Sequence, residues 1–249
     1  MQLKSKIGLV TGGTRGIGLA AAMALAEQGA DLALVARRID DEAKKAQREI
    51  ESLGCKCLLI SADLGKPAEA TACVEQTVSH FGTVDVLVHS AGGMVSGGLL
   101  TLTAEAWNSA FAVHVHAIFH LCRAAIPLMK AKKEGAVVLI SSVAGIRGIK
   151  NNVAYQAVKG TLPQLTRALA YEFADDNIRV NCVAPGVIRT DFHAQMPADV
   201  KKHNLENRIP LHREGTPRQV ADLICELVKN DYITGETLVI DGGQSMRVC

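Results

Sequence analysis

The chain reads Thr11-Gly12-Gly13-Thr14-Arg15-Gly16-Ile17-Gly18 between an apolar run, residues 7–10, and an alanine-rich run, residues 19–27. The first run predicts a short buried strand and the second predicts a helix. A glycine turn in this setting is typical of a dinucleotide site, because glycines let the backbone approach a pyrophosphate and the helix N-terminus offers free amides. The G-x-x-x-G-x-G spacing leaves a plain tight turn as the alternative.

Strand and helix signals alternate through the rest of the chain. This alternation predicts an α/β fold, with one parallel sheet and helices on both of its faces. At 249 residues the chain fits one large domain, 1–249, with a sizeable core. The predicted strands are residues 7–10, 31–35, 56–60, 84–89, 136–141, 178–183 and 237–240, and the predicted helices include 40–53, 67–81 and 153–173.

Charge and hydropathy argue against two classes of partner. A formal net charge of +2, with acidic and basic residues interspersed, offers no concentrated basic face for nucleic acid. The chain passes from Met1 into its first predicted strand without room for a signal peptide, and we find no apolar stretch of the roughly 18 residues that a membrane span needs. We therefore expect a cytoplasmic protein that binds neither nucleic acid nor membrane.

Cysteines and histidines are the candidates for a metal site. The seven cysteines are scattered, as expected of reduced thiols. Cys55 and Cys57 form a half-site without a second pair, and His116 and His120 share a helical face without a third ligand. We therefore expect no metal, and we expect these histidines to make polar or interface contacts.

The strongest chemical signal is Val153-Ala154-Tyr155-Gln156-Ala157-Val158-Lys159, in which Tyr155 stands thirteen residues after Ser142. On a helix, the four-residue spacing places the phenol of Tyr155 beside the ammonium of Lys159. A nearby cation favours the phenolate, so the tyrosine can exchange a proton near neutral pH. Such a pair suits a carbonyl and alcohol redox site, although an isolated Y-x-x-x-K also occurs as an ordinary exposed pair.

Taken together, these motifs make the chain similar to the short-chain dehydrogenases/reductases along essentially its whole length, and in particular to the 3-oxoacyl-carrier-protein reductase branch. The resemblance implies a single-domain, seven-stranded, doubly wound Rossmann-like sheet, and a homotetramer or homodimer. The matching positions are Gly12, Gly16 and Gly18 of the cofactor turn, the catalytic Ser142, Tyr155 and Lys159, and then Asp63-Leu64, Ala91-Gly92, Pro185-Gly186, Ile188, Thr190 and Asp241-Gly242-Gly243.

The resemblance also implies a role for each catalytic residue. Ser142 would hydrogen-bond the substrate oxygen, Tyr155 would pass it a proton, and Lys159 would lower the pKa of Tyr155 while holding the nicotinamide ribose. Ser141 stands beside Ser142, and only the spacing to Tyr155 selects Ser142. The residues expected at the cofactor are Gly12, Thr14, Arg15, Gly16, Ile17, Gly18, Arg37, Arg38, Asp63, Leu64, Ser90, Ala91, Gly92, Tyr155, Lys159, Pro185, Gly186, Ile188 and Thr190.

Charge near the end of the second predicted strand favours NADP(H) as the cofactor. A ribose 2′-hydroxyl is met by an acidic residue about 20 residues beyond the glycine turn, whereas the 2′-phosphate of NADP is met by arginine. The chain reads Leu34-Val35-Ala36-Arg37-Arg38 there, and Arg15 adds a further cation. The alternative is that Arg37 and Arg38 are solvated turn residues.

Two positions depart from the family pattern. Many members carry an asparagine where this chain has His114, and that asparagine is thought to hold a water of a proton relay. Because histidine also donates and accepts hydrogen bonds, His114 is a catalytic candidate in a relay that is either altered or broken. His89-Ser90-Ala91-Gly92 replaces the usual Asn-Asn-Ala-Gly. These departures keep open a second function, a cofactor-binding protein with little or no turnover.

Residues 190–214 have a weak periodic pattern, which predicts a substrate-binding loop or lid. Its charged side chains, such as Lys201, Lys202 and Glu206, favour a polar or anionic substrate over a bare hydrocarbon or steroid. The expected function is interconversion of a carbonyl and a secondary alcohol by hydride transfer, on a 3-oxoacyl thioester or a sugar or polyol.

Overall fold

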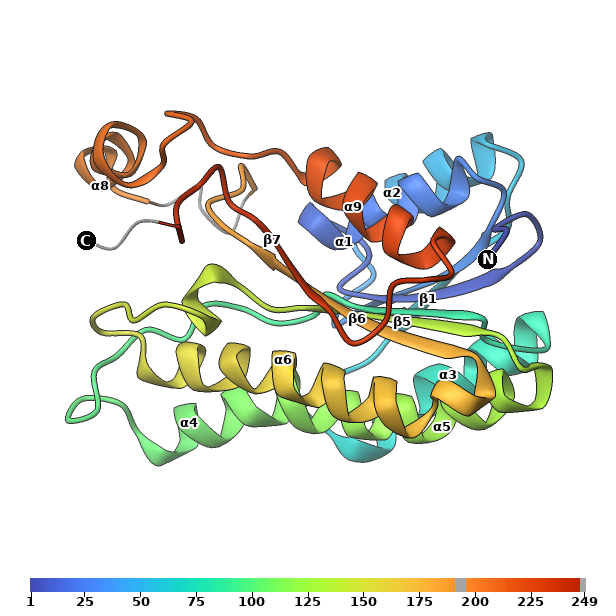
Figure 1. Ribbon diagram of the computed structural model, residues 1–249. Coiled ribbons are helices and arrows are strands. Elements are labelled where there is room, and N and C mark those ends of the chain that lie inside the picture. The colour runs from blue at the N-terminus through green and yellow to red at the C-terminus, as the bar shows by residue number, and fades with distance from the viewer. Residues whose placement is uncertain (191–195, 247–249) are drawn as a thin grey trace.

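Seven parallel strands form one sheet in the order β3-β2-β1-β4-β5-β6-β7 in the computed structural model, which describes residues 1–190 and 196–246 (Figure 1). Every neighbouring pair is parallel, as predicted. The observed bounds differ from the predicted ones by at most two residues. The strands are β1 (Ile7–Thr11), β2 (Asp31–Ala36), β3 (Cys57–Ser61), β4 (Val86–His89), β5 (Gly135–Ile140), β6 (Ile178–Pro185) and β7 (Thr237–Ile240).

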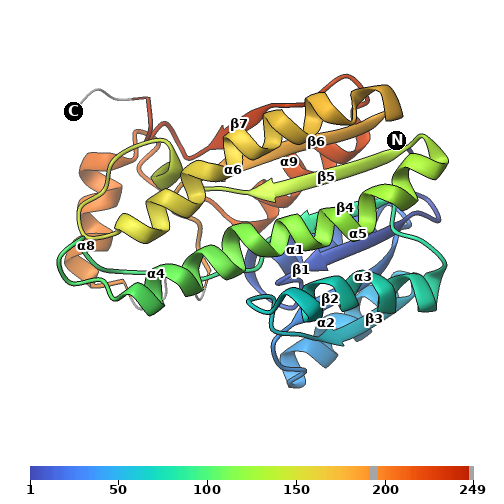
Figure 2. The ribbon, with the colours of Figure 1, turned by 90° about the horizontal axis from the view of Figure 1, so that it is seen from below.

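Helices cover both faces of the sheet, which confirms the predicted fold class (Figures 1 and 2). Alternate strand residues enter two separate cores, so Val10 and Val138 pack on one face while Leu9 and Val137 pack on the other. Strands covered on both sides in this way read as continuous apolar runs. One face carries α1 (Gly16–Ala26), α2 (Asp41–Ser52) and α9 (Pro217–Lys229), and the other carries α3 (Pro67–Phe81), α5 (Ala117–Lys132) and α6 (Val153–Glu172).

The strand order places the candidate site. β1 lies between β2 and β4, so the chain leaves β1 toward one edge of the sheet and returns on its other side at β4. In open parallel sheets, ligands bind outside the carboxyl ends of the strands at such a switch point. Thr11 and His89 end these two strands and are paired with each other in register.

A long helical run lies beside this crevice. It comprises α4 (Ala104–Phe111), the π-helical turn η1 (Ala112–His116) and α5. By length and composition residues 104–132 could cross a membrane, so our expectation that no such stretch exists was wrong. The apolar residues of this run are interrupted by polar ones, so the sequence shows no continuous apolar stretch there. Ile118, Leu121 and Met129 pack in the core under the sheet, which accounts for the run as a core helix.

The predicted substrate segment contains regular structure in its described part. Residues 198–208 form α8 (Ala198–His203) and a π-helical turn, η4 (Asn204–Arg208), and α8 lies at the end of the molecule toward which the strands point (Figure 2). Residues 191–195 lie outside the described residues. Glu214 is buried and pairs with Lys201 at 3.5 Å and with Arg189 at 3.3 Å, so it ties α8 to the chain that follows β6.

Candidate active site

The glycine turn has the geometry of a phosphate cradle. Gly12 has a φ of +63°, in the left-handed region that favours glycine. A Cβ on Gly18 would lie 2.1 Å from the carbonyl oxygen of Gly12, so only glycine allows α1 to start this close to the turn. Arg15 precedes the helix without a side-chain capping bond, and the first turn of α1 holds no acidic residue. The amides and the positive end of the helix dipole therefore suit an anion.

Other predicted cofactor residues gather around this turn. A Cβ on Gly12 would lie 3.0 Å from the Cα of Ala91, so the turns after β1 and β4 touch. The Thr190 methyl is 3.6 Å from the Cβ position of Gly16, which brings the chain after β6 to the same place. The structure thus brings together Gly12, Thr14, Gly16, Ile17, Gly18, Ser90, Ala91, Gly92 and Thr190, while Pro185, Gly186 and Ile188 lead from the end of β6 into the same segment.

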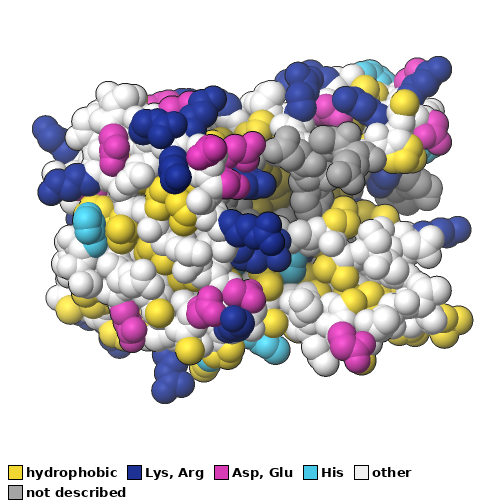
Figure 3. All heavy atoms as spheres, turned by 180° about the vertical axis from the view of Figure 1, so that it is seen from behind, with side chains coloured by type: hydrophobic (Ala, Val, Ile, Leu, Met, Phe, Trp, Pro, Cys, Tyr) yellow, Lys and Arg dark blue, Asp and Glu magenta, His cyan; other side chains and the backbone are white. Residues whose placement is uncertain are grey.

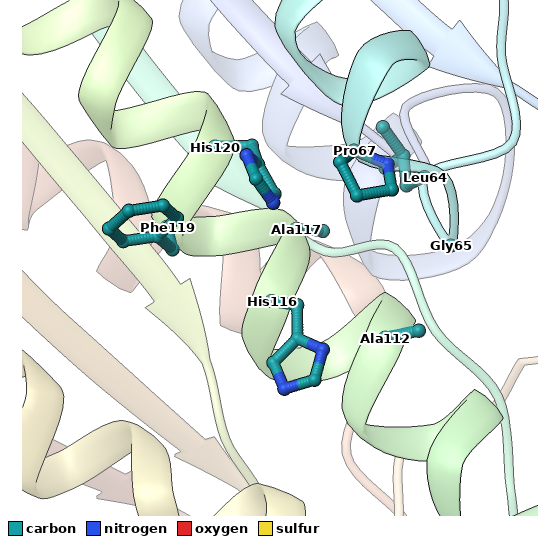
Figure 4. A pocket seen from close by; sticks show the side chains of 8 residues that line it. All are labelled: Leu64, Gly65, Pro67, Ala112, His116, Ala117, Phe119 and His120. Carbon is teal, nitrogen blue, oxygen red and sulfur yellow. The ribbon is translucent and has the colours of Figure 1, made fainter.

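Asp63 and Leu64 form the turn between β3 and α3. The Asp63 carboxylate accepts the backbone N–H of Gly65 at 3.0 Å, while Leu64 is buried in the core. Behind this turn lies a cavity of about 260 Å³ (Figure 4). The ring of His120 points toward Pro67 across the cavity and the ring of His116 points away from it, so these two histidines do not converge on one ligand (Figure 4).

The structure places Ser142 and Ser141 in different surroundings. A side-chain hydrogen bond joins Ser142 to Tyr155, and the Ser142 hydroxyl also accepts the Ala144 N–H at 3.1 Å. The Ser141 hydroxyl is buried and donates to the Lys159 carbonyl oxygen at 2.7 Å. Ser142 is therefore the serine that faces the phenol, while Ser141 ties the end of β5 to α6.

Burial controls the pKa values of Tyr155 and Lys159. It raises the pKa of Tyr155, and the hydrogen bond with Ser142 only partly offsets that shift. It also lowers the pKa of Lys159 to about 8. The Lys159 ammonium donates to the Ile140 carbonyl oxygen at 2.7 Å and lies 5.7 Å from the centre of the Tyr155 ring. The net shift of the Tyr155 pKa is therefore upward, opposite to the direction expected from Lys159, because burial is its largest cause and the Lys159 ammonium donates to a backbone carbonyl.

A buried hydrogen-bond chain through His89 joins the switch point to η1. The Thr11 hydroxyl accepts the Ala91 N–H at 3.3 Å and lies 2.9 Å from His89 Nδ1, and His89 Nε2 lies 3.2 Å from the Val113 carbonyl oxygen. A carbonyl only accepts, so we assign the His89 proton to Nε2 and let Nδ1 accept from Thr11. His89 therefore connects the Ala91 turn to the helical turn that carries His114.

His114 packs against Tyr155. Its ring meets the Tyr155 ring edge-on, with the centroids 6.1 Å apart. Its Nε2 lies 3.1 Å from the Gly93 carbonyl oxygen and 3.3 Å from the Gly93 backbone nitrogen, while its buried Nδ1 has no hydrogen-bond partner among the described residues. A Cβ on Gly92 would lie 2.0 Å from the ring, so Gly92 leaves room for the imidazole. Nδ1 is a hydrogen-bond acceptor in the tautomer whose Nε2–H donates to the Gly93 carbonyl, and it is a donor in the tautomer whose Nε2 accepts the Gly93 N–H.

Both buried histidines make the fold sensitive to acid. Burial, with a smaller effect of the Lys159 charge, lowers the pKa of His89 and of His114 to about 3. Between pH 6.5 and 3 the unfolded chain binds protons at these sites while the folded chain does not, so stability falls as the pH falls through this window. The slope is at most about 1.4 kcal/mol per pH unit for each histidine.

We expect His114→Asn to make the free energy of unfolding less dependent on pH, because one proton fewer is taken up on unfolding. The measurement is the free energy of unfolding in urea at pH 6.5, 5.8 and 5.0, a range above most carboxyl titrations. Equal slopes for the wild type and His114→Asn would contradict the prediction.

The predicted arginines differ in their contacts. Arg37 and Arg38 are exposed, and neither makes an ion pair with any residue in 1–190 or 196–246. Arg15 pairs with Asp40 at 2.8 Å and with Glu42 at 3.4 Å. Figure 3 shows basic and acidic side chains mixed around a hollow on this side of the molecule. The acidic partners of Arg15 follow the end of β2 by four and six residues and were not predicted from the sequence.

Comparison with known proteins fits this geometry. The family signature described as Enoyl-(Acyl carrier protein) reductase matches residues 12–245. The chain belongs to the short-chain dehydrogenase/reductase family. It is 37% identical to the 3-oxoacyl-acyl-carrier-protein reductase FabG of Chlamydia muridarum over 98% of each chain. It is also 37% identical to a 3alpha-hydroxysteroid dehydrogenase of Mediterraneibacter gnavus, over 97% of this chain and 98% of the relative.

Solved structures agree with that assignment. The L-sorbose reductase of Gluconobacter frateurii, solved with NADPH and L-sorbose, superposes with a TM-score of 0.92 over 100% of both chains at 29% identity. As a short-chain dehydrogenase/reductase, the protein is an oxidoreductase that acts on carbonyl and alcohol groups with a nicotinamide cofactor.

Two members of the site were not assigned a role by sequence reasoning. Thr11 carried no signal beyond its place at a strand end, and His89 was noted only as a departure from the family pattern. That departure could have pointed to the role of His89. A buried imidazole that replaces an amide needs hydrogen-bond partners for both ring nitrogens, and these nitrogens lie further apart than the polar atoms of an amide.

Proposed function

We propose that this protein is an NADP(H)-dependent short-chain dehydrogenase/reductase that interconverts a carbonyl and a secondary alcohol. The observation that carries the proposal is the Ser142–Tyr155 hydrogen bond beside the buried Lys159. This group is built on the same crevice as the glycine turn. A protein that only bound the cofactor would have no chemical need for it.

The described residues suit the cofactor at both of its ends. The glycine turn and the amides of α1 would hold the pyrophosphate. Lys159, with its pKa lowered to about 8, is mostly protonated at pH 7 and would bind ribose hydroxyls near Tyr155. The cofactor, when bound, supplies or accepts the hydride.

The protein's own part is proton transfer and positioning. Ser142 would orient the substrate oxygen, and Tyr155 would give that oxygen its proton during reduction. The raised pKa of Tyr155 keeps the phenol protonated, which suits a general acid. We propose that Lys159 and Nδ1 of His114, which has no hydrogen-bond partner among the described residues, carry the replacement proton, with Nδ1 as the hydrogen-bond partner of a linking water.

Preference for NADP(H) rests on charge. Arg15 lies at the glycine turn, and the exposed Arg37 and Arg38 follow β2, where a 2′-phosphate would need cations. A charge-assisted hydrogen bond contributes about 1.5–3 kcal/mol, so one good contact favours NADP(H) about tenfold or more. The presence of NADPH in the L-sorbose reductase structure supports the same choice.

For the substrate we propose a polar or anionic carbonyl compound, a 3-oxoacyl thioester or a keto sugar. Arg208, on the segment beyond residue 195, makes no ion pair with a described residue and supports an anionic group, whereas Lys201 pairs with Glu214 and Lys202 with Glu206. The relatives named as a 3-oxoacyl-acyl-carrier-protein reductase and an L-sorbose reductase support the two classes. A homotetramer or homodimer in the cytoplasm remains part of the proposal, and light scattering on the purified protein tests the assembly.

The test is NADPH oxidation at 340 nm with a panel of 3-oxoacyl thioesters, keto sugars, diketones and 3-oxosteroids, repeated with NADH. We expect turnover with NADPH on one of the first two classes. Turnover only on a steroid would overturn the substrate proposal, and equal Kd values for NADPH and NADH would overturn the cofactor preference. Binding without turnover on any compound would favour the cofactor-binding protein.

A further inference from the structure

Three arginines are predicted to bind the 2′-phosphate. Among the described residues, Arg15 is the one of them that makes ion pairs, and its partners lie at the N-terminus of α2. One terminal nitrogen of its guanidinium contacts Asp40 Oδ2 at 2.8 Å and Glu42 Oε2 at 3.4 Å. The pair joins the glycine turn to the N-terminus of α2. Two carboxylates therefore contact the Arg15 guanidinium, whose positive charge a 2′-phosphate would need.

The carboxylates of Asp40 and Glu42 have different roles at the N-terminus of α2. Asp40 is the N-cap of α2, and its second oxygen accepts the Ala43 N–H at 2.9 Å. Glu42 lies in the first turn of α2, where the helix dipole favours an acid, and it makes no capping bond. Glu42 can therefore be neutralised without removing the helix cap.

We propose that Glu42, with Asp40, competes with the cofactor's 2′-phosphate for Arg15 and so weakens the binding of NADP(H) without affecting NAD(H). This inference rests on the proposed role of Arg15 in holding that phosphate. Glu42 then acts as a specificity-determining residue, because its ion pair with Arg15 must break before Arg15 can bind the 2′-phosphate. The ribose 2′-hydroxyl of NAD(H) carries no charge and makes no such demand on Arg15.

The size of the competition follows from exposure. The Arg15 and Glu42 side chains are 55% and 66% exposed, so water and salt screen their attraction. Releasing Arg15 from one exposed partner is therefore expected to tighten NADPH binding about two- to fivefold. The effect should shrink at high salt.

The experiment measures Kd values for NADPH and NADH by calorimetry for the wild type and Glu42→Gln. Asp41→Asn is the matched control, because Asp41 is a neighbouring acid of the same helical turn whose one ion pair within residues 1–190 and 196–246 is with Lys44, at 3.8 Å. We expect Glu42→Gln to tighten NADPH binding two- to fivefold beyond Asp41→Asn, with the NADH Kd unchanged. In an Arg15→Gln background, the added Glu42→Gln should have no effect.

Two outcomes overturn the inference: Glu42→Gln that matches Asp41→Asn, or equal tightening of NADPH and NADH. Cofactor preference is read separately, from the wild type alone. If the wild type binds NADPH and NADH with equal affinity, the proposed NADP(H) preference is rejected, even if Glu42→Gln tightens NADPH binding. If the wild type prefers NADPH and Glu42→Gln has no effect on NADPH binding, only the competition is rejected. Melting temperatures confirm that each variant is folded.

Discussion

Tyr155→Phe lowers kcat for NADPH-dependent reduction about a thousandfold, while the Kd for NADPH changes only a few-fold. The phenol is 8% exposed, hydrogen-bonded to Ser142 and close to Lys159, so its hydroxyl is the proposed proton donor to the substrate oxygen. General acid catalysis by one positioned side chain is typically worth about 10²–10⁴ in rate. Steady-state kinetics and calorimetry measure the two quantities.

Tyr171→Phe is the matched control for this prediction. Tyr171 lies on the same helix, α6, and is 91% exposed, so the identical chemical change there should leave kcat unchanged. Retention of more than a tenth of the wild-type kcat by Tyr155→Phe would show that another group near the phenol, such as Lys159 or His114, delivers the proton.

Gly18→Ala is expected to remove most of the affinity for the cofactor, with a rise of at least about a hundredfold in the Kd for NADPH. The added Cβ would lie 2.1 Å from the Gly12 carbonyl oxygen and 2.8 Å from its carbonyl carbon, so α1 must move away from the turn. That shift separates the amides that would hold the pyrophosphate. Overpacking against rigid backbone also costs about 1–3 kcal/mol of stability.

Gly148→Ala separates the local effect from a general glycine effect. A Cβ on Gly148 meets nothing within 4 Å, so this variant should melt like the wild type and bind NADPH normally. Wild-type affinity in Gly18→Ala would mean that the turn adjusts freely, and the proposed phosphate cradle would then be rejected.

Much of the fold could be predicted because its signals are local. The apolar runs end within two residues of the observed strands, since a strand buried on both faces needs an apolar side chain at nearly every position. The spacing of Tyr155 and Lys159 was equally informative, because one helix holds both residues. The substrate segment was less predictable, since its short helix α8 has no buried residue and therefore no apolar period.

Contacts between distant segments could not be predicted in the same way. Lys159 was expected to act on Tyr155, yet it donates to Ile140, nineteen residues earlier on β5. Arg15 meets Asp40 twenty-five residues later in the chain. No pattern within one element records which of several possible partners a long side chain reaches.

The order of residues along this chain is therefore sufficient for its parallel sheet, its glycine turn and its serine, tyrosine and lysine, because periodicity and short spacings are properties of single elements. Only the packed structure decides the direction of the Lys159 ammonium, the Thr11–His89–Val113 connection and the pairing of Arg15. The physical reason is burial: once strands and helices pack, each polar group must find its partner among the groups that the topology brings near, and desolvation then sets its pKa.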